Sequence, residues 1–152
     1  MNERISGHDF GLTGHRKIGL DSNLLIYLIE TQGPLADAVA LIIDSITTGQ
    51  TKAVMSAIGL VEILMGPARV GDARMFELTA DALRDLPIQV VPLDAAIAED
   101  AAWIRGALRV GLEDAVHLAT AHAVGATAFV TNDRRLHSIP NLDVLYLDDL
   151  VA

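Results

Sequence analysis

The stretch KIGLDSNLLIYLIE, residues 17–30, decides how the whole chain is interpreted. Its first four residues, Lys17–Leu20, form a short and mostly apolar run that predicts a strand, and the run stops at Asp21. The aliphatic segment that follows predicts a helix over Leu24–Glu30, which Asp21 or Ser22 can cap. A strand that leads directly into a helix is typical of a sheet whose strands alternate with helices.

The same alternation continues along the chain. Further short apolar runs predict strands at Lys52–Met55, Ile88–Val91, Ala128–Thr131 and Val144–Leu147. Helical patterns lie between them, over 34–48, 57–65, 72–86, 95–110 and 113–124. The strands lack a two-residue alternation, which is typical of strands covered on both faces. The predicted fold class is therefore α/β, a three-layer α/β/α sandwich with a mostly parallel central sheet of about five short strands.

The length of 152 residues suits one domain with its own core. Residues 1–16, MNERISGHDFGLTGHR, carry three glycines and scattered charges without a period, which predicts a flexible N-terminal extension. Residues 17–152 are expected to form a single domain.

Composition excludes several classes of protein. Hydrophobic residues make up 51% of the chain, which excludes wholesale disorder. No apolar run reaches the ~18 to 20 residues of a membrane span, and no secretory signal is recognisable, so we expect a cytoplasmic protein without a membrane partner. The absence of cysteine excludes thiol catalysis, disulfides and cysteine zinc sites.

The charge balance is strongly acidic, with 20 acids against 11 bases and a net charge of −9. A protein that binds nucleic acid by bulk electrostatics is usually basic, so a general nucleic-acid coat is disfavoured. The balance still permits a small basic groove, a bound cation or a basic protein partner.

Four carboxylates stand where an open α/β sheet collects functional groups. Asp21 and Asp133 follow predicted strands, whereas Glu62 and Asp114 lie on predicted helices. Asp21 and Asp114 also suit helix caps, and Asp133 suits a turn. Glu62 has aliphatic neighbours on both sides, and a lone carboxylate in such surroundings shifts its pKa or finds a cation.

If these acids converge, their repulsion matters. Two carboxylates ~4 Å apart repel by ~4 kcal/mol at an effective dielectric of 20, so four together need a cation. Ligands that offer only oxygen select Mg²⁺ or Mn²⁺, which are the ions of phosphoryl transfer.

Four segments in a fixed order resemble a known family. They are LDSNLLIYLIE, the glutamate of GLVEIL, DAVHLATA and TND, and together they resemble a PIN domain of the VapC-type toxin ribonucleases from type II toxin–antitoxin systems. The resemblance runs from about residue 17 to residue 147. The departure is the segment before the first strand, because such toxins usually begin almost at that strand.

The resemblance implies a catalytic acidic quartet of Asp21, Glu62, Asp114 and Asp133. It makes Asp21 and Asp114 the principal metal ligands, with Glu62 and Asp133 completing the pocket directly or through water. It also implies a Mg²⁺-dependent endoribonuclease, with Mn²⁺ as the alternative ion, that leaves 5′-phosphate and 3′-hydroxyl ends. The implied partners are the RNA substrate and a cognate antitoxin that blocks the acidic pocket. The implied assembly is a homodimer or a higher toxin–antitoxin complex.

Several neighbours of the quartet are candidates for substrate binding. Ser22 and Thr131 match the small hydroxyl positions beside the acids. Arg134 and Arg135 could contact RNA phosphates or simply make a turn soluble, and Arg105 and Arg109 could form a second basic rail or a solvated face.

Two further features keep alternatives open. His117 lies one turn beyond Asp114, where it could orient that acid, move protons or serve as a structural histidine. The aliphatic residues of the early helices, among them Leu24, Leu25 and Ile42, exceed what one domain is expected to bury and predict a dimer face and a partner groove.

Other functions fit the same pattern. One is a housekeeping PIN nuclease in RNA maturation, and another is a non-catalytic acidic interaction module with a vestigial site. A phosphatase with Asp21 as nucleophile needs a second carboxylate two residues on, where Asn23 stands instead.

Overall fold

The structure is a computed structural model, and it describes residues 12, 14–30 and 33–150. One five-stranded sheet has the order β3-β2-β1-β4-β5, and every neighbouring pair is parallel. Its strands are β1 (Lys17–Leu20), β2 (Lys52–Ser56), β3 (Ile88–Val91), β4 (Ala128–Thr131) and β5 (Asp143–Tyr146). The predicted α/β sandwich is confirmed, and its sheet is parallel throughout.

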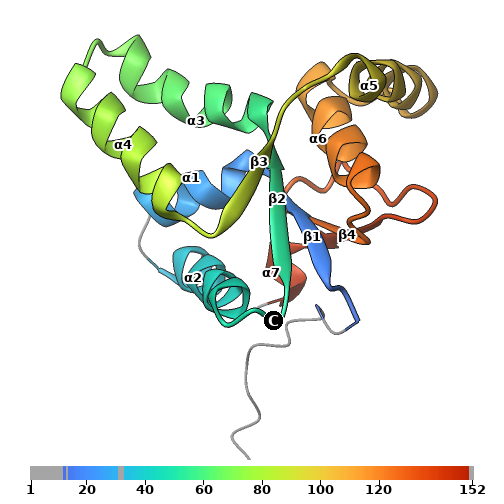
Figure 1. The fold of residues 1–152 in the computed structure, drawn as a ribbon, viewed down its shortest axis with the longest axis horizontal. Coiled ribbons are helices and arrows are strands. Elements are labelled where there is room, and N and C mark those ends of the chain that lie inside the picture. Colours follow the sequence, from blue (N-terminus) through green and yellow to red (C-terminus); the bar gives the residue numbers. More distant parts are fainter. Residues whose placement is uncertain (1–11, 13, 31–32, 151–152) are drawn as a thin grey trace, which may run out of the picture.

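Helices cover both faces of this sheet (Figure 1). They are α1 (Ser22–Glu30), α2 (Pro34–Thr47), α3 (Ala57–Arg69), α4 (Ala73–Asp85), α5 (Ala95–Leu108), α6 (Leu112–Ala123) and α7 (Leu147–Leu150). α5 and α6 lie on one face, α1, α2 and α7 lie on the other, and α3 and α4 project together from the β2–β3 side. Among these helices, no single one is long and apolar enough to cross a membrane.

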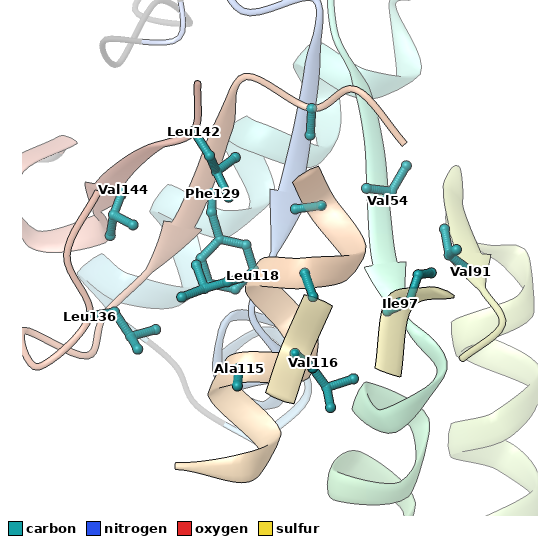
Figure 2. Packing of buried hydrophobic residues seen from close by; sticks show 14 residues of the cluster. Val54, Val91, Ile97, Ala115, Val116, Leu118, Phe129, Leu136, Leu142 and Val144 are labelled. Atoms are coloured by element: carbon teal, nitrogen blue, oxygen red, sulfur yellow. The ribbon is translucent and has the colours of Figure 1, made fainter. Parts of the chain in front are cut away.

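Each face of the sheet has its own apolar core. Figure 2 shows the α5–α6 side, where Leu118 of α6 packs beside Phe129 of β4. On the other side, Leu24 and Ile42 are buried against the sheet, and Leu25 is buried beside α3 and α4. The expectation that these three aliphatic residues contribute to a dimer face is therefore wrong, because two layers of helices bury more apolar surface than we predicted.

A glycine lets α6 approach the middle of the sheet. A Cβ atom at Gly19 of β1 would lie 2.7 Å from the Cβ of Ala121 and 2.9 Å from the ring of Phe129. These distances are shorter than van der Waals contact, so only glycine fits there. The close approach holds α6 directly over β1.

Several predicted element ends differ from the structure by one or more residues, and three of these differences are informative. α3 continues past Met65, because Pro67 falls near the helix end, where it removes only one amide donor. α5 ends before Gly111, because Arg109 adopts the left-handed conformation with φ 56°. β5 stops one residue early, and Leu147 begins α7.

Part of the predicted extension contacts the domain. Leu12 is 5% exposed and packs in the core beneath α1 and α2. His15 Nδ1 lies 2.8 Å from Thr127 Oγ1, and the carbonyl of His15 accepts a hydrogen bond from Thr51. Residues 1–11 and 13 of the extension lie outside the described residues, and the domain boundary at residue 17 stays a prediction.

Candidate active site

The candidate site lies at the topological switch point of the sheet, where the order in which the strands are added changes side. β1 lies between β2 and β4, so the connections from these two strands leave toward opposite edges. The amide of Asp21, directly after β1, donates to the carbonyl of Val130 in β4 at 3.0 Å. In open parallel sheets such a switch point forms a crevice at the carboxyl ends of the strands.

Asp21 is the buried acid of this crevice, with 5% of the residue exposed. Its Oδ2 accepts a hydrogen bond of 2.7 Å from the Thr131 hydroxyl, and its Oδ1 lies 3.8 Å from Nε2 of His117. Burial raises the pKa of Asp21, and the charge of Glu62 raises it further, against the opposing effects of His117 and Thr131.

Glu62 reaches the crevice from α3. The Ser56 hydroxyl caps this helix by accepting from the amide of Ile58, which starts α3 at the carboxyl end of β2. Glu62 Oε1 then lies 2.5 Å from His117 Nε2. Because an ionised carboxylate only accepts hydrogen bonds, Nε2 must carry the proton.

His117 of α6 is the buried imidazole that lies between Asp21 and Glu62. Burial alone would lower the pKa of His117, but the hydrogen bond to Glu62 and the charges of Asp21, Glu62 and Asp114 together raise it. Its Nδ1 is buried and has no hydrogen-bond partner within the described part of the chain. One imidazole therefore lies next to two carboxylates that come from different layers of the fold.

Asp114 lies in the first turn of α6, half-buried on the same side as His117. Burial raises the pKa of Asp114, and the charges of Asp21 and Asp133 raise it further. The effect of both carboxylates on Asp114 indicates that the acids share one electrostatic environment.

Asp133 lies at the rim of the site, and its pKa is shifted in the opposite direction. Its amide donates to Thr131 Oγ1 at 3.0 Å, so the hydroxyl that fixes Asp21 also fixes this turn. The carboxylate accepts from Arg135, with Nε 3.0 Å from Oδ1 and Nη2 2.7 Å from Oδ2. These hydrogen bonds lower the pKa of Asp133.

The expected substrate-binding residues have different surroundings. Ser22 and Thr131 are both buried, so their contact with substrate stays a prediction. Arg134 turns toward α7, where it pairs with Asp149 at 2.8 and 3.1 Å and lies over the ring of Tyr146. Arg135 alone of the two neighbouring arginines is held at the acidic crevice.

Two other sequence expectations concern α5 and α6. Arg109 is the left-handed C-cap of α5, and Arg105 Nη1 donates to the carbonyl of Val110 at 3.4 Å, so a second basic rail stays a prediction. The sequence alone does not predict the hydrogen bond between His117 and Glu62. The spacing of one helical turn between His117 and Asp114 is the signal that points to a place in the site.

The acids suit a hard divalent cation. No group of three potential ligands in residues 12, 14–30 and 33–150 is close enough to hold an ion unaided. Mg²⁺, however, keeps several of its waters and needs only one or two protein carboxylates. Asp21 and Asp114 offer oxygen donors, and burial together with neighbouring carboxylates raises their pKa values, so the residues present fit this ion.

An all-parallel sheet with carboxylates gathered at its carboxyl edge defines an α/β protein with an acidic pocket. A family model described as "PIN domain" matches residues 18–142. The chain belongs to the PIN domain family. No curated protein sequence matches it significantly.

Solved structures with the same fold include VapC toxins from toxin–antitoxin complexes. VapBC2 from Rickettsia felis, bound to a DNA fragment from its promoter, has a TM-score of 0.70 and 19% identity over 86% of this chain and 98% of that chain. DNA-bound VapBC from Salmonella typhimurium has a TM-score of 0.70 and 21% identity over the same shares. VapC20 from Mycobacterium tuberculosis, a sarcin-ricin loop cleaving toxin, has a TM-score of 0.57 and 15% identity over 74% and 86%. These likenesses establish the shared fold.

Proposed function

We propose that the protein is a Mg²⁺-dependent endoribonuclease and the toxin of a type II toxin–antitoxin pair, with Mn²⁺ as an alternative ion. The observation that carries the proposal is the convergence of Asp21, Glu62 and Asp114 on one crevice from β1, α3 and α6. The raised pKa values of Asp21 and Asp114 support a cation site, because structural caps on a surface have no reason to share a buried environment. The family and the toxin structures with this fold support the reaction class.

In this proposal Asp21 and Asp114 hold the ion, and Glu62 completes the pocket. When bound, Mg²⁺ supplies a water of lowered pKa and stabilises charge on the phosphoryl group. Thr131 fixes the Asp21 carboxylate by donating to Oδ2, and His117 fixes Glu62 by donating from Nε2. The chain thus orients its acids before any substrate arrives.

The proposed protein partner is an antitoxin with an amphipathic helix. The α3–α4 pair exposes a set of large apolar side chains, Val61, Met65, Val70, Met75, Phe76 and Leu78. A groove continues this surface between α1, α3 and α4, and its lining includes Ile26, Ile63 and Met75. Such a groove suits the apolar face of a helix, and the net charge of −9 suits a basic partner.

A homodimer, or a higher toxin–antitoxin assembly, belongs to the same proposal. Leu108 at the end of α5 and Leu112 at the start of α6 are exposed close to Asp114 in the chain. An RNA-cleaving toxin acts where RNA is found, which places the protein in the cytoplasm.

Cleavage of RNA by the purified full chain tests the enzymatic part. Total RNA is incubated with protein and Mg²⁺, and new 5′ ends are mapped by sequencing. We expect discrete new 5′-phosphate ends that disappear with a chelator and with Asp114→Asn. Uncut RNA at millimolar Mg²⁺ and Mn²⁺, with correctly folded protein, would favour the non-catalytic interaction module.

Growth after expression separates a toxin from a housekeeping nuclease. We expect the wild-type chain to arrest growth, Asp114→Asn to permit it, and co-expression of a neighbouring small gene for the antitoxin to restore it. Normal growth with active, soluble enzyme would favour a role in RNA maturation.

A further inference from the structure

Asp133 and Arg135 form a closed unit at the rim of the crevice. The guanidinium donates from Nε and Nη2 to both carboxylate oxygens, at distances of 3.0, 3.2 and 2.7 Å. The backbone amide of Arg135 adds a fourth contact, 2.9 Å from Oδ1. Such a two-pronged pair has a fixed geometry that a lysine could not reproduce.

The unit is tied to the buried part of the site. The Thr131 hydroxyl accepts from the amide of Asp133 at 3.0 Å and donates to Asp21 at 2.7 Å. The charge of Arg135 also acts on Asp114 across the crevice. The guanidinium is therefore held at a fixed place beside the acids.

Asp133 and Arg135 differ in how many of their hydrogen-bonding groups remain free. Both oxygens of Asp133 already accept from a cation, and only 19% of its side chain is exposed. The side chain of Arg135 is 85% exposed, and no contact in the described residues uses its Nη1. Of the five N–H groups of the Arg135 guanidinium, three thus remain free for a phosphate, whereas both oxygens of Asp133 are engaged.

We propose that Arg135 binds a phosphate of the RNA beside the acidic pocket, and that Asp133 is a positioning residue for Arg135 and not a ligand of the metal. This inference rests on the proposed ribonuclease function. It assigns different tasks to acids that the sequence places in one quartet. A carboxylate that engages one edge of a guanidinium leaves its outer N–H groups free to donate to a second anion.

The neighbouring arginine provides the matched control. Arg134 has the same chemistry, but its guanidinium is paired with Asp149 of α7 and lies 4.4 Å from the Tyr146 ring centroid. Replacing either arginine with glutamine removes the same charge within one residue of chain. A difference between the two variants therefore reports on placement alone.

Metal affinity tests the part of Asp133. Calorimetric titration of the full-length protein with Mn²⁺ should give a dissociation constant within about three-fold of wild type for Asp133→Asn, but weakened by about ten-fold or more for Asp114→Asn. Equal weakening in both variants would overturn the inference. This readout needs no RNA cleavage, so it stands even if the ribonuclease proposal fails.

RNA binding tests the part of Arg135. The probe is a fluorescent single-stranded RNA, titrated at several salt concentrations with Ca²⁺ in place of Mg²⁺. Arg135→Gln should weaken binding and lower the slope of log affinity against log salt by about 0.7, the value for one phosphate contact on a single strand. Arg134→Gln should leave that slope unchanged. The reverse ranking, or equal slopes for wild type and Arg135→Gln, would overturn the inference.

A double-mutant cycle joins the two parts. If Asp133 acts through Arg135, each single variant lowers kcat/KM, and Asp133→Asn costs nothing further in the Arg135→Gln background. If the effects of the two substitutions on kcat/KM multiply in the double variant, Asp133 acts independently of Arg135, and the positioning role is overturned. If the wild-type chain cleaves no RNA, the proposed function fails by itself, and the Mn²⁺ titration still decides the role of Asp133.

Discussion

Asp21 and Asp133 follow neighbouring strands and are fixed by the same Thr131 hydroxyl, yet they are opposite in chemistry. Burial raises the pKa of Asp21, although the hydrogen bond that it accepts from this hydroxyl opposes the rise. Asp133 donates to the same hydroxyl from its backbone amide and faces Arg135 at the rim, so its pKa is lowered. A place at the carboxyl end of a strand thus brings an acid to the site, whereas depth and partner determine what it does there.

Replacing the inner acid should have the largest effect. Asp21→Asn removes a proposed metal ligand, so RNA cleavage should fall by more than about 100-fold. The fold should survive, because a neutral amide in this buried position ends the repulsion with Glu62. Cleavage rates and melting temperature are measured together. Asp81→Asn on α4, an exposed acid paired with Arg84, is the control and should keep full activity. Wild-type rates in Asp21→Asn would remove this acid from the mechanism.

Replacing the buried His117 should have the second-largest effect. His117→Ala removes the imidazole that contacts Glu62 and lies 3.8 Å from Asp21, which should cost about 1–3 kcal/mol of unfolding free energy. Urea denaturation of the metal-free protein measures it. His122→Ala on the same helix removes an exposed imidazole and should leave the midpoint unchanged. Equal midpoints for both variants would show that His117 does not stabilise the inner acids.

Metal should stabilise the protein through the inner acids. At a Mg²⁺ concentration about 100 times its dissociation constant, binding adds about 2.7 kcal/mol and raises the melting temperature. Asp21→Asn should lose this shift, whereas Arg134→Gln should keep it. The same shift in wild type and Asp21→Asn would mean that the ion binds elsewhere.

The pH dependence of the metal-free protein should be the smallest effect. His117 has a folded pKa above its ordinary 6.5, so its contribution is complete below pH 6.5 and is lost as pH rises through the folded pKa. Asp21 and Asp114 act in the same direction from 3.8 upward, because their folded pKa values are raised. Asp133 acts oppositely, since its stabilisation is lost as pH falls below 3.8.

Unfolding free energies measured between about pH 6 and pH 9 check this prediction. Stability should decline with pH in the wild type, and His117→Gln should flatten the decline. A rise in stability over this range would contradict the assigned charge of His117.

The fold and the positions of the acids follow from local sequence patterns. A short apolar run that ends at an acid predicts both a strand and its functional end, as at Asp21, and strong periodicity predicts the covering helices. The structure confirms the α/β sandwich, and the acids that follow β1 and β4 share the hydroxyl of Thr131.

The remaining features depend on contacts between distant parts of the chain. His117 and Glu62 are 55 residues apart, so neither residue's neighbourhood reveals their hydrogen bond. Arg134 and Arg135 are adjacent and chemically identical, and only the turn after β4 sends them to different partners. Helix ends such as that of α3 depend on tertiary packing, which can override a proline signal.

The position of β4 beside the central strand β1 bears on how the protein is made. β1 pairs with β4, whose residues come more than a hundred positions later, so the middle of the sheet must stay open until most of the chain has left the ribosome. Such distant pairing is slow to form, because a long loop must close first. The hydroxyl that fixes both Asp21 and Asp133 comes from this late strand. A nascent or prematurely terminated chain therefore lacks the hydroxyl that holds Asp21 and Asp133 in place.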